Sequence, residues 1–152
     1  YKDRFQDNNE NDVIEEKINP ITELLQAYEK TLIDPNRIDL FKDIYDGIGL
    51  DRQSRIISQS DTILIKDSKD FALSNFWLVK VENDLILLPG RTLKVNVSSL
   101  VADNARYARD LLSGIFKYSL SNEFRLNQYG IIQLHGDHYI VKDPGRIDLP
   151  KT

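Results

Sequence analysis

The sequence contains no cysteine, and this absence excludes disulfide bonds, thiolate metal sites and cysteine nucleophiles together. Methionine is absent too, which leads us to expect that the chain begins inside a longer protein or after trimmed residues. No apolar run approaches the roughly 18 residues that a membrane-spanning helix needs, and no signal segment opens the chain. We therefore expect a cytoplasmic location, with an upstream membrane anchor left open.

Glycine is scarce, and the seven glycines never form a phosphate-binding loop of the G-x-G-x-x-G or G-x-x-x-x-G-K type. No segment resembles the nucleophile elbow of a serine hydrolase. A concentrated basic face is also missing. Residues 1–34 carry nine acidic and four basic side chains, whereas residues 71–152 carry eight and ten. We predict a chain that is not an enzyme and holds no cofactor, and the charge distribution disfavours binding to duplex DNA.

The 152 residues suffice for one ordinary domain with an extension. We divide the chain into a disordered leader at 1–11, a helical segment at 12–50, a connector at 51–70 and a small β-barrel domain at 71–152. The leader is rich in Asp, Asn and Glu, with little apolar surface to bury.

Two proline signatures predict helix starts in the N-terminal part. Asn19-Pro20 and Asp34-Pro35 each place a capping side chain before a proline at the first helical position. The first helix is expected over residues 20–33, with one apolar stripe. The second is expected to end at Gly47, and its predicted apolar face consists of Ile38, Phe41, Ile44 and Tyr45.

A β-hairpin is the strongest local signal in the sequence. Two apolar runs, 76–81 and 85–88, flank Asn83-Asp84, a pair that tolerates the backbone of a short turn. Pro89-Gly90 predicts a type II turn in which Gly90 has a positive φ. Residues 92–97 alternate with period two, which predicts a further strand of the same sheet.

The remaining segments predict one helix and several short strands. Ser98 or Ser99 can cap a helix that reaches about Ile115. A second Pro-Gly turn is expected at Pro144-Gly145. The expected strands or extended segments are 55–57, 62–65, 124–126, 131–134, 138–141 and 147–149, and residues 116–118 lead from the helix to the later strands. We predict an α+β fold: an N-terminal helical segment followed by a small SH3-like β-barrel with one inserted helix.

The C-terminal half carries an ordered set of motifs: Phe76-Trp77-Leu78-Val79, Leu87-Leu88-Pro89, Leu93-Lys94-Val95-Asn96, a helix closing on 112–116, Phe124-Arg125-Leu126, Tyr139 and Gly145-Arg146-Ile147-Asp148-Leu149. This order resembles the C-terminal module of a group of largely uncharacterised cyanobacterial proteins. The resemblance covers about residues 71–149 and, more weakly, 24–45. It implies a small β-barrel after helical or coiled-coil segments and a cyanobacterial source. It supplies no catalytic or ligand residues.

Aromatic and arginine side chains are the candidate partner-binding residues. Trp77, the only tryptophan, alternates with Phe76 in one predicted strand, so one of the two packs in the core. The outward one could form an aromatic groove with Tyr118, Tyr129 or Tyr139 that holds an extended peptide. Arg91 and Arg146 each follow a Pro-Gly pair. They are either solvated turn residues or a pair of guanidinium groups that bind a carboxylate or phosphate.

His135-Gly136-Asp137-His138 is the one constellation that resembles a metal site. The alternative is a hairpin turn on Gly136-Asp137 with a histidine on either side. Because the chain has no further histidine, we favour the turn and predict no metal.

These patterns favour a non-enzymatic interaction or assembly module at the C-terminal end of a larger protein. Its partner would be another protein or, through the N-terminal helices, a second copy of the chain. The alternative is single-stranded nucleic-acid binding, because small barrels with exposed aromatic and arginine side chains can stack bases. The acidic balance of the chain gives this alternative little support.

Overall fold

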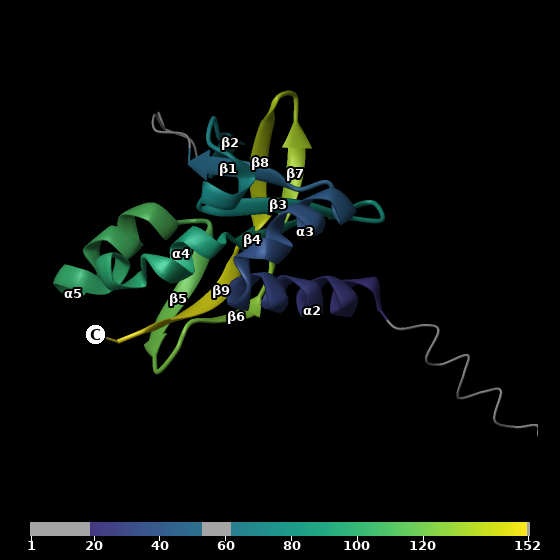
Figure 1. The fold of residues 1–152 in the computed structure, drawn as a ribbon. Helices are drawn as coiled ribbons and strands as arrows, with labels where there is room; N and C mark the ends of the chain where they lie inside the picture. Colours follow the sequence, from purple (N-terminus) through teal and green to yellow (C-terminus); the bar gives the residue numbers. More distant parts are fainter. Residues whose placement is uncertain (1–18, 53–61, 152) are drawn as a thin grey trace, which may run out of the picture.

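A computed structural model describes residues 19–52 and 62–151 of the chain (Figure 1). The predicted leader 1–11 and the expected strand 55–57 lie outside the described residues. The elements are, in order, α2 (Pro20–Ile33), the 3-10 helix η1 (Pro35–Arg37), α3 (Ile38–Ile44), β1 (Ile48–Arg52), β2 (Ile63–Lys66), the 3-10 helix η2 (Phe71–Leu73), β3 (Phe76–Val81), β4 (Asp84–Pro89), α4 (Arg91–Val95), α5 (Val97–Leu112), β5 (Phe116–Ser121), β6 (Arg125–Gln128), β7 (Gly130–His135), β8 (His138–Asp143) and β9 (Gly145–Pro150).

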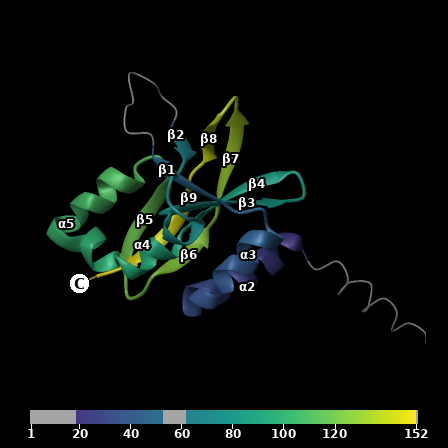
Figure 2. The ribbon, with the colours of Figure 1, turned by 45° about the horizontal axis from the view of Figure 1, so that its top comes forward.

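Six strands close into a small barrel in the order β1-β2-β8-β7-β4-β3, and every neighbouring pair is antiparallel. The other three form a second sheet, β5-β9-β6, in which β9 pairs in parallel with β5 and antiparallel with β6. Figures 1 and 2 show α5 at one side of the fold and α2 and α3 at another, and α4 lies between them, where Lys94 contacts α2. The predicted α+β fold, with N-terminal helices and a small β-barrel, is confirmed.

The barrel begins at Ile48 rather than at residue 71. Strand β1 was not predicted, and its residues span the boundary between the predicted helical segment and the connector. Strand β2 comes from the connector itself, where residues 62–65 were expected to be extended. Both strands are needed for closure, since β1 pairs with β3 and β2 pairs with β8.

The β3–β4 hairpin is confirmed, but its turn lies one residue earlier than predicted. The turn residues are Glu82 and Asn83, and Asp84 pairs with Val81 in the ladder. Glu82 has the positive φ, 56°. The register places Trp77 beside Leu88, and this pairing of buried side chains determines where the turn falls.

Both faces of this hairpin are buried, which explains its nearly continuous apolar sequence. Phe76 and Leu78 of β3 face the barrel core, a cluster that continues to α5 and the second sheet. Trp77 and Val79 face the opposite way, into a second cluster beneath α2 and α3 that we call the helix-side core. The hairpin is therefore the wall between the two cores.

The strand predicted at residues 92–97 is wrong, because this segment forms α4 and the start of α5. Only Leu93 of the alternating residues is fully buried, and Val95 is 55% exposed. Gly90 has φ −68°, so the predicted type II turn is also wrong. A Cβ at Gly90 would meet the backbone of Ser74 and Asn75. Glycine is therefore needed here for close packing and not for a positive φ.

Helix α2 begins as predicted, whereas α3 begins at Ile38, three residues after the predicted start at Pro35. The Asn19 side chain accepts a 2.9 Å hydrogen bond from the Ile21 N–H, and Pro20 is the first residue of α2. The second proline signature starts η1, which leads into α3. Asp46, and not Gly47, has the positive φ (50°) after α3, while the Gly47 N–H donates to the Lys42 carbonyl over 2.9 Å.

The C-terminal strands form where predicted, but they do not all belong to one barrel. A single residue, Tyr129, separates β6 from β7, and Pro144 separates β8 from β9. At these two residues the chain passes between the barrel and the second sheet. Pro144-Gly145 is therefore a junction between two strands, and the predicted turn there is wrong. The predicted helix is α5, interrupted by residues 103–105 with φ between 56° and 60°.

Candidate interaction surface

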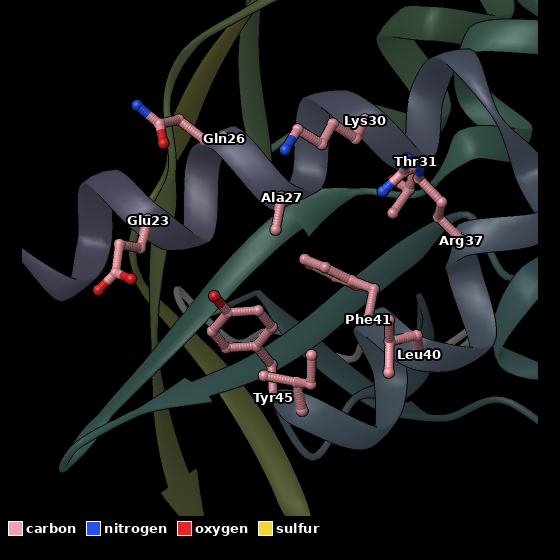
Figure 3. Close-up of a pocket in the computed structure, with 10 residues that line it drawn as sticks. Glu23, Gln26, Ala27, Lys30, Thr31, Arg37, Leu40, Phe41 and Tyr45 are labelled. Carbon is pink, nitrogen blue, oxygen red and sulfur yellow. The ribbon is translucent and has the colours of Figure 1, made fainter.

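A groove runs between α2 and α3 on the outer side of the helices (Figure 3). Its volume is about 300 Å³. One wall is a stripe of α2 with Glu23, Ala27 and Lys30, which recur at helical spacing. The other wall is formed by η1 and α3, and it includes the residues Arg37, Leu40, Phe41, Ile44 and Tyr45. We call this feature the helix groove.

The floor of the helix groove is aromatic and is continuous with the helix-side core. Phe41 is buried, and its ring centroid lies 5.1 Å from that of Tyr45 and 5.7 Å from that of Trp77. Tyr28 packs edge-on against Trp77, with 6.0 Å between ring centroids. Because interlocked aromatic rings in a packed core have little freedom to move, the floor has a fixed shape.

Exposed apolar side chains border the groove. Leu40 and Ile44 lie one turn apart on α3 and are 61% and 60% exposed. The apolar spacing of the sequence predicted that Ile44 lies on the inner face of this helix together with Ile38 and Phe41. Only the latter two are buried, so that part of the prediction is wrong for Ile44. Leu40 was missed. One sequence signal could have identified it. The seven residues of α3 include four large apolar side chains, more than one buried face of so short a helix can cover, so some of them must be exposed.

Charged residues at the groove have opposite signs at its two ends. Glu23 is near Tyr45. The pKa of the Tyr45 hydroxyl is raised, chiefly by burial and in addition by the negative charge of Glu23. Lys30 and Arg37 lie toward the other end, as Figure 3 shows. The Arg37 guanidinium also pairs with Asp34, with 3.7 Å between Nε and Oδ2.

Two hydrogen bonds hold α2 on the rest of the fold. The Tyr28 hydroxyl donates to the Pro89 carbonyl over 2.6 Å, and Lys94 of α4 donates to the Leu32 carbonyl over 3.4 Å. The second contact satisfies a carbonyl in the last turn of α2, where a cation is also favoured by the helix dipole. The helix groove is therefore built on elements that are fixed to the barrel.

Trp77, the first of the predicted partner-binding residues, is a core residue. It is fully buried, stacks on Phe71 with 4.5 Å between ring centroids, and donates from Nε1 to the Phe71 carbonyl over 2.8 Å. Its polar atom is thus satisfied inside the protein. The predicted aromatic groove around Trp77 is wrong. Tyr118 and Tyr139 are half-buried and pack against the barrel core on the other side of β3.

Arg91 and Arg146 lie in different elements, and neither follows a Pro-Gly turn. Arg91 is the half-buried first residue of α4, and Arg146 is exposed on β9 in the second sheet. Arg146 is the register partner of Lys117 on one side and Gln128 on the other.

His135 and His138 flank the turn of the β7–β8 hairpin, as the alternative reading predicted. They are register partners, and Gly136 has φ 64° in the turn between them. His138 Nδ1 lies 3.6 Å from the Asp137 carboxylate. Across residues 19–52 and 62–151, no three side chains of the types that ligate metals gather into a group able to hold an ion.

No helix in the described part of the chain is long and apolar enough to cross a membrane. The chain matches no protein-family model, no curated protein and no solved structure. The resemblance to the cyanobacterial module stays a prediction.

Proposed function

We propose that this chain is a non-enzymatic interaction module that docks a protein segment in the helix groove. The observation that carries the proposal is the exposed pair Leu40 and Ile44 beside a concave aromatic floor. An amphipathic helix in a partner would bury these side chains with anchors at i, i+3, i+4 and i+7. The lack of cysteine fits a cytoplasmic setting, where such an assembly would work in a reducing compartment.

The energetics favour a modest but specific contact. Complete burial of one leucine or isoleucine side chain contributes about 1.5–3 kcal/mol, and Leu40 and Ile44 each still have about 60% of their surface to bury. The groove is preformed by residues of the helix-side core, so little conformational entropy is lost when a partner binds.

Site-directed photo-crosslinking tests this proposal. A photoreactive amino acid replaces Leu40 in one variant and Leu134, which is 54% exposed on β7, in the control. After irradiation in cells, we expect protein adducts from position 40 that are absent or much weaker from position 134. Equal adducts from both positions, or none from position 40, would overturn the proposal.

A second candidate, single-stranded nucleic-acid binding, is favoured by one observation. Lys117, Arg125 and Arg146 are exposed on the same face of the second sheet. Two features weaken it: Arg125 is paired with Glu123 over 2.6 Å, and Tyr118 packs against the barrel core on the opposite face, away from these cations. Anisotropy of a labelled single strand under a salt titration decides the matter, because phosphate binding weakens steeply as salt rises.

A further inference from the structure

The opposite charges at the two ends of the helix groove give it a direction. Glu23 and Lys30 are seven residues apart on α2, which is about 10 Å along the helix axis. Arg37 extends the basic end onto η1. A surface with this polarity is complementary to a copy of itself turned by half a revolution, since the acidic end of each copy then faces the basic end of the other.

The apolar residues suit the same arrangement. Leu40 and Ile44 form a ridge along α3, immediately beside the groove that separates α3 from α2. Ala27 lies midway along the α2 wall, and its small side chain leaves room for a ridge to approach (Figure 3). Helices pack by placing the ridges of one into the grooves of another. Under two-fold symmetry, the ridge of each copy enters the groove of its partner.

We infer that the occupant of the helix groove is a second copy of this chain, docked antiparallel about a two-fold axis, with Glu23 of each copy opposite Lys30 and Arg37 of the other. This inference rests on the proposed function and names its partner. The chain then assembles into a homodimer through α2 and α3, and the two barrels lie on the outside of the assembly, because each barrel is behind its own helices (Figure 2).

Charge reversal tests the antiparallel pairing directly. In sedimentation velocity, we expect the wild-type chain to change from monomer to dimer as its concentration rises. Glu23→Lys and Lys30→Glu each place like charges in both symmetric contacts, so each variant alone should have a dissociation constant at least about tenfold higher. An equimolar mixture of the two variants should recover most of the wild-type affinity, because positions 23 and 30 again carry opposite charges in both contacts of the mixed dimer.

The ridge is tested by Leu40→Asp, which should abolish the dimer. Leu134→Asp is the matched control, an exposed leucine outside the groove, and it should leave the dimer unchanged. All four substituted side chains are exposed, so circular dichroism is expected to show an unaltered fold. A wild-type chain that stays monomeric at all concentrations would overturn the inference, and so would a mixture of charge variants that fails to recover the dimer.

The crosslinking experiment distinguishes failure of the homodimer from failure of the proposed interaction module. Adducts from position 40 that contain only this chain agree with the homodimer. Adducts from position 40 to a different protein would overturn the homodimer while leaving the interaction module in place.

Discussion

The hydroxyl of Tyr28 lies 2.6 Å from the carbonyl oxygen of Pro89 and donates a hydrogen bond to it inside the protein. The two residues are 61 positions apart in the chain. Tyr28 is on the inner face of α2, and Pro89 is the last residue of β4, so the bond joins one wall of the helix groove to the barrel. It is one of the contacts that place α2, and with it the helix groove, against the barrel.

Tyr28→Phe should lower the free energy of unfolding by about 1–2 kcal/mol, because the Pro89 carbonyl then stays buried without this donor. Urea unfolding followed by circular dichroism measures the change. Tyr107→Phe is the matched control, since Tyr107 is 51% exposed and should tolerate the substitution. Equal stability of the two variants would contradict the role assigned to this hydrogen bond.

Tyr28 also predicts a loss of stability at alkaline pH. Burial, and secondarily the charge of Glu29, raise the pKa of the Tyr28 hydroxyl well above its ordinary value of 10.0. Above pH 10 the unfolded chain releases this proton while the folded chain keeps it. The unfolded state then binds fewer protons, so the free energy of unfolding falls as pH rises from 10 toward the folded-state pKa.

The alkaline loss should be smaller in Tyr28→Phe than in the wild-type chain. It should not vanish, because the pKa of Tyr45 is raised as well. Unfolding curves at several pH values between 9 and about 11 compare the two proteins, near the intrinsic tyrosine pKa. Parallel pH profiles would show that Tyr28 ionises equally easily in both states.

Arg52 joins β1 to the end of α5. Its Nη1 donates to the carbonyls of Ser113 and Leu111, over 2.6 and 3.3 Å, where a helix leaves carbonyls without partners. Arg52→Leu should lower the free energy of unfolding by about 1 kcal/mol through the loss of these bonds. Arg106→Leu, at an exposed position on α5, is the control for the charge change. Denaturation of both variants in parallel shows whether position 52 matters beyond its charge.

Local signals in the sequence were sufficient to predict α2 and the β3–β4 hairpin. Asn19-Pro20 specifies a helix start through one hydrogen bond and one fixed φ angle, and both depend only on neighbouring residues. The apolar runs of the hairpin predict strands in the same way. The turn position was missed because it follows from which side chains face each other across the hairpin.

Tertiary packing decided the segments that were predicted wrongly. The alternation of residues 92–97 is typical of a strand, but β4 already pairs with β3 and β7 within the barrel. The segment becomes a helix that buries Leu93. Strand β1 was missed because Gly49 and Asp51 weaken its strand pattern. Gly49 is needed since a Cβ there would meet the Ser74 side chain.

The helix groove could be predicted only in part. The sequence indicated two amphipathic helices and self-association through them, but it placed the binding residues on the barrel. Trp77 was predicted as a binding residue because a tryptophan in a strand can face either the core or the solvent. The helix-side core shows why it faces inward: α2 and α3 cover that face of the hairpin, and nothing local in residues 76–79 specifies this.

Gly90→Ala should lower the free energy of unfolding by about 2 kcal/mol, a typical value for overpacking at a rigid site. The new Cβ would meet the Ser74 carbonyl oxygen and the Asn75 backbone, and backbone atoms cannot rotate away. Gly136→Ala is an instructive comparison. Gly136 has a positive φ and no neighbouring atom within 4 Å, so only about 1 kcal/mol of backbone strain is expected there. Thermal unfolding compares the stabilities of the two variants, and Gly90→Ala should be the less stable. A less stable Gly136→Ala would contradict the close approach of the backbone at Gly90.

A fragment that starts at residue 71 should not fold cooperatively, although it contains most of the strands. It lacks β1 and β2, which lie between β3 and β8 in the closed barrel. Without them, both of those strands have an unpaired edge, and the side chains of Leu50 and Leu64 are missing from the barrel core. Trp77 also loses the cover of α2 and α3.

Fluorescence of Trp77 during urea unfolding tests whether the fragment folds cooperatively. Residues 19–152 should give one sharp transition from a buried to an exposed signal. A sharp transition in residues 71–152 would mean that seven strands and α5 form a stable unit without β1 and β2.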